Sequence, residues 1–400
     1  MRGERRTKII AIVLAILFTF MQLAGWQISM RYGTSVHRSE FFQNIGVLHG
    51  VQLVFAAVFE TAFWYAAADF SFYFLGRRKK RRRGGKNELT GGGENISGNR
   101  VWLLTWIALS GCLFIGLLAC WPGIYSYDAQ GQLGQAMYPE TVYTMHHPLL
   151  HTLFMGKIIT LGYRVSGENL ASGILLYSIV QMLICSAVFT YAVCFIRKIT
   201  GRRWLTAAAF LYYAFFPTVV LFTFCTTKDV LCSAFLHLMT ILTFELYQDM
   251  TGFFAGKGKA VLLILSGVLM CLFRNNGVYA VVLAAIFAAV FFRQNLRAVC
   301  FVLIPVAALS VLSNRGLQTA LQARSPSMVE ASSVPIQQLA RVYCDEGEAG
   351  FDAEQLDLLY QAVSPETLEG YDPAIADSIK NFVSFDDVVM GQKGAYLKLW

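Results

Sequence analysis

The stretch LASGILLYSIVQMLICSAVFTYAVCFI, at residues 170–196, sets the class of this protein. It contains no charged side chain, and Arg197 and Lys198 follow it at once. About 20 apolar residues are enough for a helix to cross a bilayer. Lys and Arg collect at the cytoplasmic ends of such helices. The stretch therefore predicts a membrane-spanning helix whose C-terminal end faces the cytoplasm.

The composition of the whole chain points the same way. Of its 400 residues, 56% are hydrophobic and 14% are charged, and the mean hydropathy is +0.50. A soluble domain has about 25% charged residues. These values exclude an ordinary cytosolic globule and a disordered chain. They predict an all-α fold, a polytopic transmembrane helix bundle in the cell membrane.

The apolar runs predict nine crossings, and with the N-terminus in the cytoplasm every strongly basic turn falls on the cytoplasmic side. The run Arg77–Arg83 follows an apolar stretch, so it indicates topology rather than nucleic-acid binding. The predicted crossings are residues 9–30, 45–75, 101–121, 170–196, 204–224, 230–247, 260–273, 278–292 and 299–312.

Charge and composition also predict five regions along the chain. Residues 314–400 hold 6 basic and 13 acidic groups, so the last part is acidic, and Asp352 is placed to cap a helix over 353–362. A second cap is expected at Asp372, before Pro373. The regions are an N-terminal transmembrane hairpin (1–76), a basic and Gly-rich cytoplasmic linker (77–100), a transmembrane core (101–313) with an outer loop (122–169), an acidic helical extracytoplasmic segment (314–395), and the start of a partial tenth crossing (396–400).

The outer loop contains apolar residues at helical spacing between polar ones. This pattern predicts an amphipathic helix that lies along the outer membrane surface. The alternative is an extra crossing, which would invert the rest of the topology, and the basic turns after residues 196 and 292 argue against it. The spaced residues are Leu149, Leu150, Leu153, Phe154, Ile158 and Leu161.

Polar groups in four separate parts of the chain fall on the outer face under this topology. Ionisable groups next to membrane helices are candidates for function. These candidates are Tyr127 and Asp128 after the third crossing, His146 and His147 (with His151) in the outer loop, Lys228 and Asp229 before the sixth crossing, and Arg274, Asn275 and Asn276 after the seventh.

The acid and the histidines each allow two interpretations. Asp128 is either a solvated loop acid or a catalytic carboxylate beside a Pro-Gly turn. His146 and His147 either cap a helix that begins at Pro148 or carry a proton near neutral pH. Adjacent residues on a helix do not face the same way, which argues against a metal shared by the two histidines.

The cations allow two interpretations as well. Lys228 either pairs with its neighbour Asp229 or binds a lipid phosphate. Arg274 either reaches out to headgroups or holds a phosphate with its guanidinium fork.

These residues, together with Val334–Arg341, resemble the GT-C superfamily of membrane glycosyltransferases. More narrowly, they resemble a bacterial family of multi-pass membrane proteins that is uncharacterised. The resemblance covers residues from about 101 to 400. It implies transfer of a sugar, at the outer face, from a polyprenyl-phosphate-linked donor to a hydroxyl of an envelope glycan or lipid. It also implies that Asp128 is the base or a metal ligand, and that Lys228 and Arg274 stabilise the leaving phosphate.

The chain departs from the superfamily pattern in one respect. Many members carry two neighbouring acids in the first outer loop, whereas here the next acid after Asp128 is Glu140. No metal ligand is therefore assigned and a divalent metal stays open, with no other cofactor expected. If the acid and the cations share a substrate, a gap of roughly 6–12 Å between Asp128 and Lys228 or Arg274 would be acceptable.

Two other functions compete with sugar transfer. A transporter or lipid flippase would carry ionisable groups within its helices and would have broken helices. Glu60 and Asp69, inside the second crossing, fit that alternative. A non-catalytic scaffold would use residues 314–395 to bind a partner. Whether Gln337, Gln338 and Arg341 bind substrate or dock the outer segment is open at this point.

Overall fold

The fold is helical throughout the part of the chain that the structure describes. The computed structural model describes residues 2–31, 47–83, 94–138, 140–255, 257–291, 296–325, 329, 332–372, 375–380, 383–384 and 388–400. Within them every regular element is a helix, which confirms the all-α prediction there. The chain divides into two compact units, one of residues 90–326 and one of residues 1–89 with 327–400.

Among the described residues, four helices are long and apolar enough to cross a membrane, so the chain is a membrane protein. They are Asn99–Ala119 within α4 (Glu94–Ala119), α7 (Leu170–Thr200), α10 (Lys228–Gln248), and Val299–Ala320 within α14 (Leu296–Ala320). Each coincides with a predicted crossing. A fifth candidate is a bent pair of helices. Four or five crossings are therefore supported among the described residues, and the predicted nine are not confirmed.

The bent pair lies at the crossing predicted over residues 204–224. Helix α8 (Arg203–Phe215) and helix α9 (Pro217–Thr223) meet at an angle of 51° and together pass as one candidate span. A proline ring disfavours helical backbone at the preceding residue, and Phe216 is extended, with φ −67° and ψ 120°. The break within this span was not predicted.

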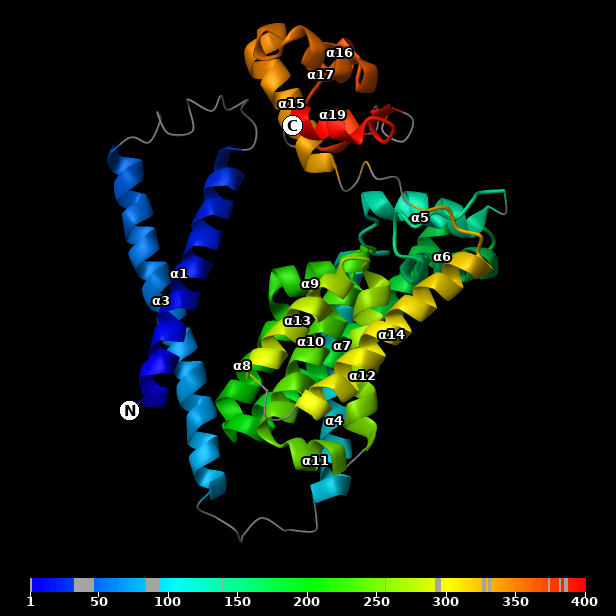
Figure 1. The fold of residues 1–400 in the computed structure, drawn as a ribbon. Helices are drawn as coiled ribbons and strands as arrows, with labels where there is room; N and C mark the ends of the chain where they lie inside the picture. Colours follow the sequence, from blue (N-terminus) through cyan, green and yellow to red (C-terminus); the bar gives the residue numbers. More distant parts are fainter. Residues whose placement is uncertain are drawn as a thin grey trace. The chain divides into compact units, whose positions relative to one another are not determined.

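The other predicted crossings correspond to helices whose described apolar parts are shorter than a typical span. They are α1 (Arg2–Arg31), α3 (Val47–Arg83), α12 (Lys257–Phe273) and α13 (Gly277–Phe291). Helices α1 and α3 lie side by side (Figure 1), with a hydrogen bond between Thr61 and Thr19 of 3.2 Å. Because α3 continues to Arg83 and α4 begins at Glu94, both ends of the predicted linker are helical.

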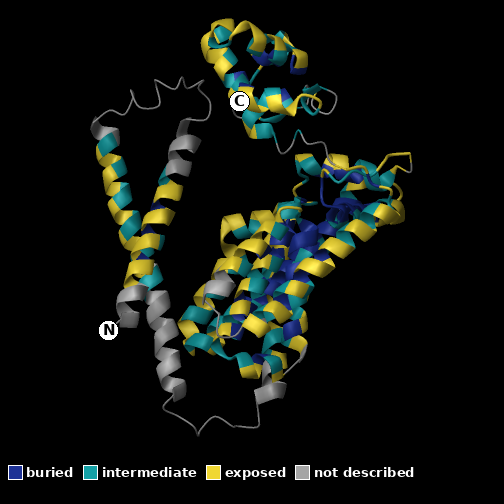
Figure 2. Cartoon of the chain, viewed as in Figure 1, coloured by how far each residue is buried: buried dark blue, intermediate teal, exposed yellow. Residues whose placement is uncertain are grey.

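The core of the 90–326 unit lies between α7, α10, α12 and α14, where the buried residues concentrate (Figure 2). Leu231, Leu242 and Leu263 are at most 1% exposed. Helix α6 (Leu149–Val165) approaches α7 closely at Gly162. A Cβ on Gly162 would lie 2.7 Å from the Cα of Gly173, so the small residues permit this contact.

Residues 332–400, called here the C-terminal lobe, form a cluster of short helices. They are α15 (Ser333–Glu346), a 3-10 turn (Gly347–Gly350), α16 (Ala353–Ala362), α17 (Pro365–Glu369), α18 (Asp377–Lys380) and α19 (Lys393–Leu399). Asp352 caps α16 in a capping box with Gln355, as predicted. The residues after the second expected cap, 373–374, lie outside the described residues.

The last residues of the chain belong to helix α19. Residues 396–400 lie in or next to this helix, and Leu399 is 9% exposed and belongs to the core of the lobe. The crossing expected to start here stays a prediction.

Candidate functional site

Two loops a hundred residues apart in sequence are joined by backbone hydrogen bonds at one end of the bundle. Ile124 N–H donates to the carbonyl oxygen of Phe224, and Thr226 N–H donates to that of Ile124, both at 2.9 Å. Ser126 N–H donates to Oγ1 of Thr226 at 2.9 Å. This pairing fixes the start of α5 (Tyr127–Met137) against the start of α10.

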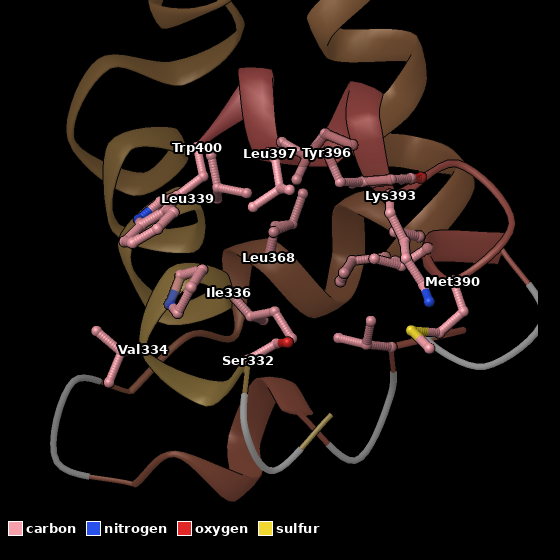
Figure 3. A pocket seen from close by; sticks show the side chains of 16 residues that line it. Ser332, Val334, Ile336, Leu339, Leu368, Met390, Lys393, Tyr396, Leu397 and Trp400 are labelled. Atoms are coloured by element: carbon pink, nitrogen blue, oxygen red, sulfur yellow. The ribbon is translucent and has the colours of Figure 1, made fainter. Parts of the chain in front are cut away.

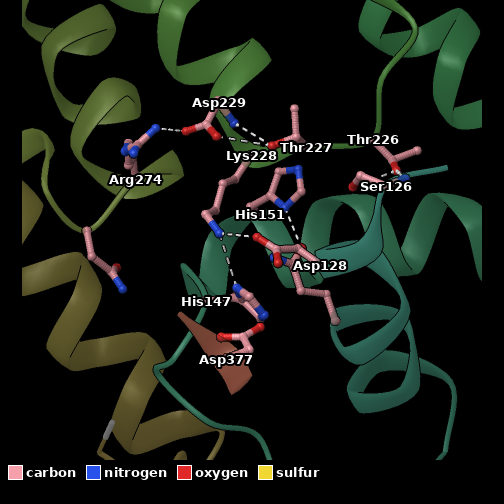
Figure 4. A network of polar contacts seen from close by, with 12 residues as sticks. Ser126, Asp128, His147, His151, Thr226, Thr227, Lys228, Asp229, Arg274 and Asp377 are labelled. Carbon is pink, nitrogen blue, oxygen red and sulfur yellow. Dashed lines mark hydrogen bonds and ion pairs between the residues drawn. The ribbon is translucent and has the colours of Figure 1, made fainter. Parts of the chain in front are cut away.

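As a result, Asp128 of α5 contacts Lys228 of α10 (Figure 4). Lys228 Nζ lies 2.5 Å from Asp128 Oδ2 and 3.3 Å from His147 Nδ1. The side chain of Asp128 is 42% exposed and that of Lys228 is 20% exposed. Partial burial alone would raise the pKa of Asp128, but the hydrogen bond and the charge of Lys228 outweigh it, so the pKa is lowered.

Asp128 and Lys228 therefore lie closer together than the gap of roughly 6–12 Å considered acceptable. The pair is in direct contact, because a carboxylate and an ammonium held at the same partly buried site neutralise each other. The local pair of Lys228 with Asp229 does not form either. Neighbouring residues on a helix point in different directions, and Asp229 instead faces another helix.

That other helix is α12, and Asp229 forms an ion pair with Arg274 at its end. Thr227 caps α10 by accepting a hydrogen bond from the Asp229 N–H, and it donates to Asp229 Oδ2 at 3.2 Å. Asn275 Nδ2 donates to the carbonyl oxygen of Met145 at 3.1 Å. Two carboxylate–cation pairs, from α5, α10 and the end of α12, thus lie at the same end of the bundle.

The remaining predicted residues differ in how they contribute. His147 is 8% exposed, and its ring meets that of the exposed His146 edge-on, with centroids 4.4 Å apart. The N-cap of α6 is Pro148, which has no side-chain acceptor, so neither histidine caps this helix. Tyr127 is 81% exposed and Asn276 is exposed, and neither takes part in the contacts above.

A buried polar chain beneath the ion pairs was not predicted. His151 Nδ1 lies 2.6 Å from Gln132 Oε1, and its Nε2 lies 3.2 Å from the hydroxyl of Tyr177. That hydroxyl donates to Gln181 at 2.7 Å, and Gln181 Nε2 donates to the carbonyl oxygen of Cys225 at 2.9 Å. This series of hydrogen bonds therefore runs from α5 to the loop that precedes Lys228.

His151 is neutral in this chain. Burial, followed by the positive charge of Lys228, lowers its pKa to about 3. One ring nitrogen of a neutral imidazole donates and the other accepts. Gln132 Oε1 can only accept a hydrogen bond, so Nδ1 is the nitrogen that carries the proton and donates to it. Nε2 is then the unprotonated nitrogen, and it lies beside the Tyr177 hydroxyl.

The face of α6 that packs against the bundle is partly polar. Leu149 of the predicted apolar stripe is buried, but Leu161 is 57% exposed, and the inner face contains His151, Thr152 and Gly156. Helices in membranes pack through small and polar residues, because their apolar residues are equally stable against lipid. A sequence signal existed in Tyr177 and Gln181, two polar residues four apart within an apolar run.

The donor set around Asp128 does not fit a divalent metal. Across the described residues, no group of three or more His, Cys, Asp and Glu side chains is arranged to hold a metal ion. The nearest group to the carboxylate is also an ammonium, which repels a metal cation.

The three open residues of α15 make contacts inside the C-terminal lobe. Gln337 Nε2 donates to the carbonyl oxygen of Ser333 at 3.1 Å, and Gln338 Oε1 accepts from Trp400 Nε1 at 2.5 Å. Arg341 pairs with Asp345 at 3.5 Å. The contact of Gln338 with Trp400 joins α15 to the end of the lobe, whereas the other two contacts lie within α15.

Comparison with known proteins identifies one family. Residues 137–384 match the model of a "Family of unknown function (DUF6020)". Neither a curated protein nor a solved structure matches the chain.

Proposed function

We propose that this chain, which belongs to the DUF6020 family, is a membrane glycosyltransferase. It would move a sugar from a polyprenyl-phosphate-linked donor to an acceptor hydroxyl at the outer face of the membrane. The observation that carries the proposal is the meeting of one carboxylate, Asp128, with Lys228 and the neighbouring Arg274–Asp229 pair at one end of the bundle. An acid and two cations are the groups that this transfer requires.

The charge distribution of the bundle supports placing this end outside. At the opposite end, α7 finishes with Arg197 and Lys198, and α12 begins at Lys257. Basic residues favour the cytoplasmic side. The proposal includes the cell membrane as the location, an N-terminus in the cytoplasm and the nine-crossing topology, whose other basic turns follow the same rule.

In the proposed resting state, each cation is held by a carboxylate. The donor phosphate competes for Lys228 and Arg274, since an arginine fork and a lysine charge both bind phosphate oxygens. When Lys228 turns from Asp128 to the phosphate, the carboxylate becomes free to accept a proton. Binding of the donor thereby prepares the base.

The chemical step is transfer of the sugar from the donor phosphate to the acceptor oxygen. The acceptor oxygen forms a bond to the anomeric carbon, and its proton passes to Asp128. The bond between that carbon and the phosphate oxygen breaks, and the phosphate leaves with the electron pair, stabilised by Lys228 and Arg274. A base works best when its pKa is near the operating pH. Release from Lys228 removes the interaction that lowers the pKa of Asp128.

The histidines take different parts in this scheme. His147 Nδ1 accepts a hydrogen bond from Lys228, so it orients the ammonium group rather than taking the proton of the acceptor. His146 is exposed to solvent and has no assigned part in the proton transfer.

A transporter or lipid flippase is the second candidate. The break between α8 and α9 favours it, because transporters bind their substrates at interrupted helices. The buried chain through His151 and Tyr177 adds polar groups inside the bundle. Transport, unlike transfer, leaves the bond between sugar and phosphate intact.

The test uses the full-length protein in liposomes that contain radiolabelled polyprenyl-phosphate hexoses and pentoses. Transfer predicts release of free polyprenyl phosphate and a labelled sugar on an added acceptor or on water. The Asp128→Asn variant should lose at least about 100-fold in rate, the contribution of a general base. Glu140→Gln, which changes an exposed acid of the same loop, should keep full activity.

Two outcomes would contradict the proposal. Full activity of a normally folded Asp128→Asn variant would remove the assigned base. Movement of the intact sugar–lipid across the bilayer, with no cleavage by the unchanged protein or by the Asp128→Asn variant, would show transport instead.

A further inference from the structure

The C-terminal lobe contains an apolar cavity of about 500 Å³ (Figure 3). This volume lies within the range of ligand-binding pockets, roughly 300–1,000 Å³. Its walls come from α15, α16 and α19, with residues such as Ile336, Leu339 and Leu359. Voids larger than a water molecule are few in protein interiors, so a space of this size is not ordinary packing.

The polar atoms of the aromatic residues at the cavity are bonded to protein groups. The hydroxyl of Tyr396 donates to the carbonyl oxygen of Leu358 at 2.7 Å. The indole N–H of Trp400 donates to Gln338. A polar ligand would lose its hydrogen bonds to water here without replacement, so the part of a ligand that enters is hydrocarbon.

Exposed apolar side chains and one cation also line the cavity. Val334 is 60% exposed, Leu397 is 70% exposed and Trp400 is 59% exposed. Lys393 is the charged residue among the side chains that line the cavity, and it is exposed to solvent. A ligand would therefore meet apolar surface first, with a positive charge beside it.

Lys393 differs from two other cations of the lobe, for which ion pairs are observed. Arg341 pairs with Asp345, and Lys380 pairs with Asp377. Residues 314–400 hold 6 basic and 13 acidic groups, so the surrounding segment repels anions. Among the residues that line the cavity, Lys393 is thus the one that attracts an anion.

We propose that this cavity binds a long-chain fatty acid, with the hydrocarbon inside and the carboxylate beside Lys393. At about 30 Å³ for each water-sized group, the cavity holds about 16 such groups, which corresponds to one acyl chain rather than the two of a phospholipid. The cavity lining shares no residue with the Asp128 cluster, and the proposed ligand does not depend on the proposed transferase activity.

The experiment uses the full-length protein in nanodiscs and a palmitate probe that carries a photoreactive diazirine. After irradiation and digestion, mass spectrometry should find the label on peptides of α15, α16 or α19. Unlabelled palmitate should compete for the site, whereas a polyprenyl phosphate should not. The methyl ester of the probe should label more weakly, because it cannot pair with Lys393.

Two lysines of α19 provide the matched pair of variants. Lys393→Gln should reduce labelling by the acid about three- to fivefold, the strength of an exposed ion pair, and should leave labelling by the ester unchanged. Lys398→Gln removes a lysine of the same helix that does not line the cavity, and should have no effect. Ala362→Phe, which fills the cavity, should abolish labelling by both probes.

Other results would overturn the inference. They are label found only outside the lobe, equal labelling of the Lys393→Gln and unchanged proteins by the acid, or competition by polyprenyl phosphate but not by palmitate. Because Lys393 is exposed, its variant tests the site even if Ala362→Phe fails to fold.

Discussion

Helix α10 has a charged cluster at each end, and the two clusters are built differently. Near its C-terminal end, Glu245 is bonded to Lys259 at 2.7 Å, to Lys198 at 3.0 Å and to the hydroxyl of Tyr191 at 2.9 Å. The Glu245 side chain is 9% exposed. At the N-terminal end, Asp128 has a lysine partner and is 42% exposed.

The difference separates a structural cluster from an exchangeable one. Glu245 ties α7 and α12 to α10, and a buried carboxylate with three partners has no room for a ligand. The Asp128–Lys228 and Asp229–Arg274 pairs are one-to-one and accessible to water, so a phosphate can replace a carboxylate at little cost. Changes at the N-terminal end of α10 should therefore affect turnover, and changes at its C-terminal end should affect stability.

The largest effect is expected from Lys228→Gln. It should lower the transfer rate about 100-fold, because one group that stabilises the leaving phosphate is lost. Stability should change by about 1 kcal/mol, because the pair is partly exposed to water. Turnover in the liposome assay and thermal unfolding in detergent would be measured, with the exposed Lys157→Gln as the control. A stability loss without a rate loss would make this cluster structural too.

Glu245→Gln should show the opposite behaviour. Removing the charge leaves two lysines without their partner, which should cost about 2 kcal/mol of stability. Thermal unfolding at a fixed scan rate would detect it as a lower midpoint. The rate at a temperature well below the midpoint should match that of Glu140→Gln. A large rate loss in folded protein would end the distinction between the two clusters.

The buried chain below Lys228 predicts sensitivity to acid. The pKa of His151 is lowered to about 3 in the folded protein, whereas it is about 6.5 when unfolded. Between these values the unfolded chain binds the proton, so stability falls as pH decreases below 6.5. At pH 5 the loss is about 2 kcal/mol.

His151→Gln should remove that part of the pH dependence, measured as the shift in unfolding midpoint between pH 7 and pH 5. The exposed His146→Gln should keep it. If His151→Gln and the unchanged protein lose the same stability on acidification, His151 is not held neutral by burial.

The smallest effect should come from Arg274→Lys, which keeps the charge but removes the fork. A single ammonium pairs with Asp229 but binds two phosphate oxygens less well. We expect kcat/KM for the lipid-linked donor to fall about tenfold, mostly through KM. An unchanged KM would indicate that Arg274 serves α10 and α12 rather than the donor.

Sequence alone predicted the helical membrane architecture because long apolar runs admit few other structures. It placed Lys228 and Arg274 on one side by counting alternating helices. It missed the direct contact of Lys228 with Asp128, because that contact depends on backbone bonds between Ile124 and Phe224, whose apolar side chains carry no signal for it. Local patterns do not encode pairing between distant loops.

Two other features were readable but overlooked. The break at Phe216 follows from the proline after it. Tyr177 and Gln181 stand four residues apart in an apolar run, the spacing of one helix face.

The pairing of Ile124 with Phe224 and Thr226 also has a consequence for biosynthesis. Asp128 leaves the ribosome 100 residues before Lys228. At a synthesis rate of about 5–20 residues per second, Lys228 is added to the chain roughly 5–20 s after Asp128. During that interval α5 has no second loop to hold it. A nascent chain that stops before residue 224 therefore contains the acid but not the site.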